Sequence, residues 1–107
     1  MQTLKVLGQS APGATTETDL YTVPGATSAA VSTLVVCNRG TSATFRVSVS
    51  VAGAATTNKD YILYDVTVSA NDTYMATLGI GLATTDKVRV YASTANLSFN
   101  LFGVENS

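Results

Sequence analysis

The chain contains no histidine, no tryptophan and a single cysteine, Cys37. Histidine is the commonest general base near neutral pH and the commonest metal ligand. Its absence excludes the Ser-His-Asp and Cys-His catalytic arrangements. One cysteine cannot form an internal disulfide and cannot make a zinc site alone. We therefore interpret Cys37, which ends an apolar run, as a small buried residue.

Charge is also scarce, because charged residues make up 12% of the 107 residues and the net charge is -1. Globular proteins usually carry about 25% charged residues. Binding to phosphates needs several Lys or Arg side chains on one face, whereas the basic residues of this chain are scattered among acids. We therefore expect no nucleic-acid partner. A surface with little charge can be buried against another protein at low ionic desolvation cost, which favours a domain that works in an assembly.

Long apolar runs are missing too. None reaches the roughly 18 residues of a membrane-spanning helix, so we expect no membrane partner. The opening residues MQTLKVLGQSAPG lack the apolar core of a signal peptide. We expect synthesis in a cytoplasm, with any release by a route other than secretion.

Motifs of catalysis and cofactor binding are not evident. The sequence Gly79-Ile80-Gly81 has no helix-forming segment or GK[ST] sequence after it, so it predicts a turn and not a phosphate loop. Carboxylate pairs such as Glu17 and Asp19 are explained by solvation at a strand edge. Calcium is conceivable at loop carboxylates, but no D-x-D-x-D-G array is present. We expect no enzyme activity, no catalytic or metal site and no cofactor.

The pattern that is present is alternation of apolar and polar residues, which is typical of half-buried strands. In Phe45–Val51 the apolar side chains fall on one face and Arg46, Ser48 and Ser50 on the other. Poor helix formers crowd the chain, and turn signals recur about every 8–12 residues. The predicted strands are Leu4–Leu7, Asp19–Val23, Ala29–Cys37, Phe45–Val51, Tyr61–Val68, Thr73–Leu78, Lys87–Ala92 and Leu97–Leu101.

These strands, about eight in all, predict an all-β fold: an antiparallel two-sheet β-sandwich with a Greek-key or jelly-roll-like topology. We divide the single domain into residues 1–18, an N-terminal strand and mobile arm, and residues 19–107, the sandwich itself. Tyr61–Val68 is expected to bend near Asp65. The stretch Gln9–Thr18 is either a plain connector or a contact arm that orders on assembly.

Candidate interface residues follow from alternation and from residue type. Tyr91 is predicted to point outward with Lys87 and Arg89, and Phe102 to lie opposite Phe99 and Leu101. An outward aromatic ring favours a subunit contact. The candidate set is Leu34, Tyr61, Tyr91 and Phe102, together with Pro12 and Gly13 of the arm. We expect Tyr61 and Tyr64 to lie on opposite faces.

Several segments resemble a family of small proteins encoded in the genomes of tailed phages. The resemblance spans nearly the whole chain and is carried by Asp19–Pro24, Ser32–Gly40, Thr44–Val49, Lys59–Asp65, Asp86–Ser93 and Leu97–Glu105. These motifs are strand and turn patterns, so they specify a fold better than a task. The resemblance implies a β-sandwich subunit of a phage virion.

What the resemblance implies about function has two versions. The first is a capsid decoration, or cement, protein that forms a homotrimer and binds the major capsid protein of the assembled head. The second is a tail, neck or fibre component, with or without contact to a host-surface glycan. A third alternative from the residues alone is a glycosidase built on a carboxylate pair, but alternation gives no such pair facing one cleft.

Overall fold

The structure is a computed structural model that describes residues 1–107. It contains eight strands and two short 3-10 helices. The elements are β1 (Gln2–Ser10), β2 (Thr18–Thr22), β3 (Ser28–Asn38), β4 (Ala43–Ser50), η1 (Val51–Gly53), η2 (Asn58–Asp60), β5 (Tyr61–Val68), β6 (Thr73–Leu82), β7 (Lys87–Ala92) and β8 (Leu97–Asn106). Each predicted strand is present, and no helix is long and apolar enough to cross a membrane.

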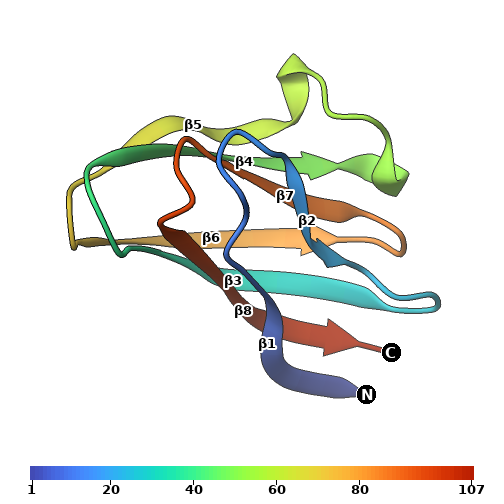
Figure 1. The fold of residues 1–107 in the computed structure, drawn as a ribbon. Helices are drawn as coiled ribbons and strands as arrows, with labels where there is room; N and C mark the ends of the chain where they lie inside the picture. Colours follow the sequence, from blue (N-terminus) through green and yellow to red (C-terminus); the bar gives the residue numbers. More distant parts are fainter.

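The strands form two four-stranded antiparallel sheets that lie as two layers (Figure 1). Sheet A has the order β1-β8-β3-β6, and sheet B has the order β2-β7-β4-β5. The first strand therefore pairs with the last, the second with the seventh, the third with the sixth and the fourth with the fifth. This is the arrangement of a long hairpin wrapped into two layers, which defines a jelly roll. The predicted two-sheet sandwich is confirmed.

The core lies between the inner faces of the two sheets. Phe99, Leu101 and Leu34 come from sheet A, and Phe45 and Val90 come from sheet B; all are at most 1% exposed. The rings of Phe45 and Phe99 meet edge to face with their centroids 5.8 Å apart. Inward residues of both sheets thus interdigitate, as expected for packed sheets.

A bulge in β3 reverses one sequence prediction. Against β8, Val31 pairs with Gly103 and Thr33 pairs with Phe102, so Ser32 is an extra residue in β3. A one-residue insertion flips all later side chains to the other face. Leu34 therefore faces the core and is 0% exposed, and its prediction as an outward interface residue is wrong. Cys37 is half-buried instead of buried, because the same shift turns it outward.

A second bulge corrects the prediction at Gly79. The glycine was expected in a turn, but β6 continues to Leu82. Between the pairs Thr33–Thr77 and Val31–Ile80, β6 holds one more residue than β3. Gly79 has φ +61°, a conformation that glycine adopts without steric cost. The glycine thus allows the strand to bulge and continue.

The N-terminal residues belong to the sandwich. β1 pairs with β8 along its whole length, and Leu7 joins the core. In the segment after β1, Pro12 is buried and Gly13 is exposed, and the Thr15 N–H donates to the Ala92 carbonyl at 2.8 Å. Residues 1–18 are therefore joined to the same core as residues 19–107. The mobility of Gln9–Thr18 stays a prediction.

The buried side chain of Asn38 fastens one end of the sandwich. Its amide nitrogen lies 2.8 Å from the Thr41 carbonyl, 3.0 Å from that of Val68 and 3.2 Å from that of Ser69. Its carbonyl oxygen accepts from the Gly40 N–H at 2.9 Å. Asn38 is 2% exposed. One side chain thus connects the β3–β4 turn to the β5–β6 turn, which links the two sheets.

Candidate functional site

The two outer faces of the sandwich differ sharply in chemistry. We call the outward-facing residues of sheet A face A and those of sheet B face B. In β1, β8, β3 and β6, the outward residues are Gln, Ser, Thr, Asn, Gly, Ala, Val, Leu, Phe, Met and Cys. The outward strand positions of face A therefore hold no charged residue; the charged side chains nearest to it are Lys5, at the groove described below, and Arg39, which donates to Ser98. Face B carries Asp19, Arg46, Asp65, Lys87 and Arg89.

The apolar part of face A is assembled from three strands. Leu4 of β1 pairs with Val104 of β8, which pairs in turn with Ala30 of β3. Two residues further along β1, Val6 pairs with Phe102 of β8. Leu4 is 84% exposed and Val6 is 44% exposed. Leu4, Val6, Phe102 and Val104 line a shallow, mostly apolar groove of about 440 Å³, together with Lys5, Ser32 and Gly103.

Bulges put these residues on the outside. In β1 alternation leaves Val6 outward and turns Leu7 into the core; because Leu7 is the extra residue of the bulge, the next residue, Gly8, also lies on the core side, opposite Leu101. The bulge at Ser32 turns Thr33 outward beside Phe102. The prediction that Phe102 lies opposite Phe99 and Leu101 is confirmed, because those two residues are fully buried and Phe102 is half-buried in the groove.

Face A continues over β3 and β6 with small and apolar side chains. Val35 pairs with Met75, which is 68% exposed, and Thr33 pairs with Thr77. An exposed apolar patch with no charge is a common mark of an interaction surface. Covering it displaces water from apolar area without stripping water from ions.

Face B holds an arginine between two tyrosines. The guanidinium carbon of Arg46 lies 4.4 Å from the ring centre of Tyr64 and 4.7 Å from that of Tyr91. Arg46 Nε also donates to Asp65 at 2.7 Å, and this ion pair raises the pKa of the guanidinium. The expected outward direction of Tyr91 is confirmed. These contacts leave Arg46 already paired, so it does not present a free cation.

Tyr61 and Tyr64 lie together, and the prediction that they lie on opposite faces is wrong. Their rings meet edge to face at 5.0 Å. Register shifts on both sides of Val47 place extra residues in β5. The expected bend at Asp65 is confirmed, since that residue has φ +49°. Tyr64 is 57% exposed, so face B does present an aromatic surface.

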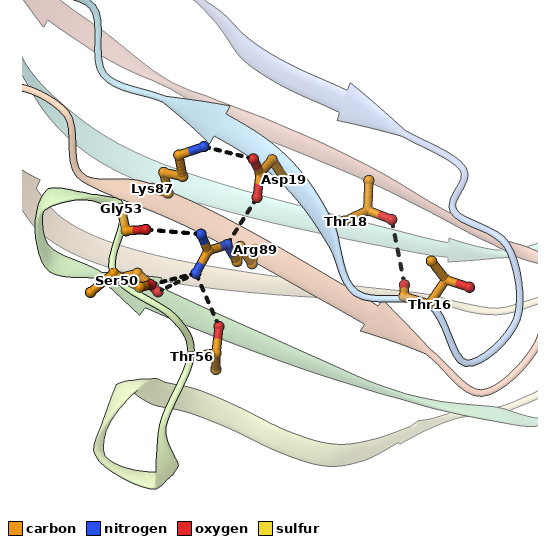
Figure 2. A network of polar contacts seen from close by, with 9 residues as sticks. Thr16, Thr18, Asp19, Ser50, Gly53, Thr56, Lys87 and Arg89 are labelled. Carbon is orange, nitrogen blue, oxygen red and sulfur yellow. Dashed lines mark hydrogen bonds and ion pairs between the residues drawn. The ribbon is translucent and has the colours of Figure 1, made fainter.

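Arg89 organises the other end of face B (Figure 2). Its Nε donates to Asp19 at 2.9 Å, and Lys87 reaches the same carboxylate at 2.8 Å. Its other nitrogens donate to the Ser50 and Thr56 hydroxyls and to the Gly53 and Ala54 carbonyls. The hydrogen bonds from Lys87 and Arg89 lower the pKa of Asp19. The network fixes the loop after β4 against β7 and β2.

A second ion-paired cluster joins the sheets beside the chain ends. The Tyr21 hydroxyl donates to Glu105 at 2.6 Å, and Lys5 donates to the other carboxylate oxygen at 3.2 Å. These contacts lower the pKa of Glu105. Burial and the neighbouring carboxylate raise the pKa of Tyr21. Every contact in this cluster is explained by structure, so it suggests no catalytic task.

The candidate residues from the sequence therefore fall in four different places. Phe102 lies in the groove of face A, and Tyr61 and Tyr91 lie on face B. Leu34 is in the core, and Pro12 and Gly13 lie in the connector after β1. The sequence reasoning missed Leu4, Val6 and Val104, although Leu4 and Val6 are separated by the two-residue spacing that signals a shared face. No three His, Cys, Asp or Glu side chains lie close enough together to hold a metal ion.

Comparison with known proteins adds evidence about the fold. The sequence matches no family model and no curated protein. A chain in the structure of infectious bursal disease virus, Gx strain, superposes with a TM-score of 0.58 at 12% identity, covering 98% of this chain and 32% of the viral chain. This protein thus spans about a third of the length of that neighbour.

Two further neighbours superpose less closely. One is the acid-stable capsid structure of Helicobacter pylori bacteriophage KHP30, with a TM-score of 0.47 at 14% identity over 98% of this chain and 92% of that one. The other is the nucleoplasmin-like N-terminal domain of Drosophila FKBP39, with a TM-score of 0.45 at 19% identity over 88% and 83% of the two chains. The match to the bursal disease virus chain, at a TM-score of 0.58 and 12% identity, shows a shared fold.

Proposed function

We propose that this protein is a structural component of a phage virion, namely a decoration protein that binds the assembled head through face A. The observation that carries the proposal is the contrast between the two faces: the outward strand positions of face A hold no charged residue and form a mostly apolar groove, at which the one charged residue, Lys5, is paired with Glu105, whereas face B carries several charges that are paired with one another. The jelly-roll fold and the viral neighbour support it. No catalytic activity is part of the proposal.

The size of face A suits such a contact. Four strands spaced about 4.8 Å apart, with a rise of about 3.3 Å per residue, cover about 19 by 30 Å, or about 600 Å². A standard interface buries about 800 Å² on each partner. Face A with its rim therefore supplies an interface of ordinary size.

The mechanism is stabilisation by mass action. A protein that binds the assembled shell and not the separated subunits stabilises the shell by RT ln(1 + [L]/Kd), about 2.7 kcal/mol at a free concentration of 100 times Kd. The major capsid protein is the partner in this mechanism, and the apolar groove is where a capsid side chain inserts.

The first test is the copy number in purified particles of the phage that carries the gene, measured by quantitative mass spectrometry. A ratio to the major capsid protein near one, or a simple fraction of it, supports decoration. A few copies per particle, or none, contradicts it.

The second test asks whether face A makes the contact. Particles lacking the protein are supplied with wild type, with Leu4→Lys/Val6→Lys on face A, or with Ile62→Lys/Thr67→Lys on face B. Both double variants add two lysines to an exposed edge strand. Wild type and the face B variant should restore heat resistance, while the face A variant should not. Equal rescue by both variants contradicts the assignment of face A.

A second candidate is a tail or fibre component that contacts a host glycan. The specific observation in its favour is the exposed aromatic surface of Tyr61 and Tyr64 on face B. This candidate predicts that soluble protein blocks phage adsorption and that Tyr64→Ala does not. Full adsorption at a saturating dose of wild type contradicts the glycan contact.

A further inference from the structure

Four strands form the edges of the two sheets: β1 and β6 in sheet A, and β2 and β5 in sheet B. An edge strand exposes unpaired backbone N–H and C=O groups, and proteins protect such edges with charge, shortness or bulges. β1 is protected by Lys5, which pairs with Glu105, and by its bulge after Val6. β2 has five residues, one of them Asp19.

The edge at β5 is protected in the same ways. Asp65 lies in the strand with φ +49°, and it bonds Arg46. Register shifts on both sides of Val47 bend β5 away from a regular ladder. Three of the four edges thus resist pairing with another strand.

β6 differs from the other edges. It has ten residues and contains neither a charged residue nor a proline. The part before the Gly79 bulge, Thr73–Leu78, pairs with β3 in continuous register from Cys37–Thr73 to Thr33–Thr77. Apart from this pairing with β3, its backbone makes no hydrogen bond to another element. Three of its six residues, Thr73, Tyr74 and Thr77, are strong β-formers. A segment of this length with no charge, no proline and no glycine has a composition that favours strand-to-strand association.

We propose that Thr73–Leu78 pairs antiparallel with the same segment of a second copy of this chain. Antiparallel pairing across a two-fold axis brings two copies of the same segment together, with residue i of one copy opposite residue j of the other and the reverse, which is how a closed dimer forms. Because Thr73–Leu78 contains no charged residue, pairing the segment with its own copy brings no like charges face to face. Addition of a strand to an open sheet edge is a general mode of recognition.

The resulting dimer has one continuous eight-stranded sheet. The order becomes β1-β8-β3-β6 followed by the same strands of the second copy in reverse. The two copies of face A then lie side by side on one surface. This inference stands apart from the proposed function, since self-association can be measured without any particle.

Sedimentation equilibrium of the full chain, from about 10 µM to about 1 mM, measures the association. Wild type should approach a mass twice that of the 11.0 kDa chain. Met75→Lys/Thr77→Lys places four ammonium groups at the joint, and it should raise the dissociation constant at least tenfold. Ile62→Lys/Thr67→Lys, which adds the same charge to the β5 edge, should dimerise like wild type.

Amide hydrogen exchange of the wild type at the two ends of the concentration range gives a test that needs no variant. Protection of amides within Thr73–Leu78 should rise with concentration, while amides of β1, β2 and β5 keep their rates. A monomeric wild type at the highest concentration overturns the proposal. So does a dimer that survives Met75→Lys/Thr77→Lys, or a rise in protection confined to β1.

Discussion

Replacement of Asn38 tests whether one buried amide fastens the two sheets. In Asn38→Ala the carbonyls of Thr41 and Val68 and the N–H of Gly40 lose their side-chain partner. A hydrogen bond contributes about 1 kcal/mol net, and a buried polar group left unpaired costs about 1–3 kcal/mol. The expected loss is about 4 kcal/mol, a large part of the roughly 5–15 kcal/mol that stabilises a domain of this size.

Asn38→Asp separates this explanation from simple loss of volume. An ionised Asp presents oxygen to the carbonyls that the amide nitrogen contacts, so burial and repulsion raise its pKa in the folded state. Because the pKa of the introduced carboxyl group is higher in the folded variant than in the unfolded chain, the stability linked to its protonation is fully present below the unfolded pKa of about 3.9. That stability is lost as the pH rises through the folded pKa. At pH 7 Asn38→Asp should therefore be less stable than Asn38→Ala, and at pH 3 the order should reverse.

Urea unfolding followed by circular dichroism at both pH values measures these differences. By the size scaling of melting temperatures, Asn38→Ala should melt about 15–20 °C below wild type at pH 7. Asn58→Ala, an exposed position with no side-chain hydrogen bond, should change stability by less than about 0.5 kcal/mol. A loss below about 1 kcal/mol for Asn38→Ala, or no reversal with pH, refutes the reasoning.

Three further predictions concern the bulge in β1, the ion-paired cluster and the Arg89 network. A Cβ at Gly8 would lie 2.1 Å from the Leu20 carbonyl oxygen, whereas one at Gly25 meets nothing within 4 Å. Thermal unfolding should show Gly8→Ala destabilised by about 2–3 kcal/mol and Gly25→Ala nearly unchanged. The pKa of Glu105 is lowered on folding, so its contribution is present above the unfolded pKa of about 4.3 and lost as pH falls. The stability difference between pH 7 and pH 3 should therefore be smaller in Glu105→Gln than in wild type, and an unchanged difference contradicts the role of the Tyr21–Glu105–Lys5 cluster. Arg89→Met should speed proteolysis in the loop 51–57, since four of its side-chain contacts hold that loop and the residue before it. Lys59→Met, a change at an 81% exposed side chain, is the control and should cleave like wild type.

Much of the fold was predictable because alternation is a local property. Phe45, Val47, Phe99 and Leu101 were placed inside from the sequence, and all four are fully buried. Strand positions follow from residue type and turn signals, which act over a few neighbouring residues. The interface roles of Phe102, Tyr61, Tyr91, Pro12 and Gly13 stay predictions.

The errors fall at bulges, where a local rule stops working. One extra residue in β3 moved Leu34 into the core, and extra residues in β5 brought Tyr61 beside Tyr64. Whether a strand contains a bulge depends on the neighbouring strand, which is distant in the sequence. The alternation of apolar and polar residues within one strand therefore cannot reveal a bulge.

By itself the sequence determined that this chain is a small, weakly charged all-β protein without histidine. Composition and a period of two are sufficient for that, since each is read from neighbouring residues. The tertiary structure alone decided that the first strand pairs with the last, that Asp19 meets Arg89, and that Leu4, Ala30 and Val104 share one uncharged face. These features depend on the pairing order of strands far apart in the chain, and that order is set by the packing of the whole sandwich.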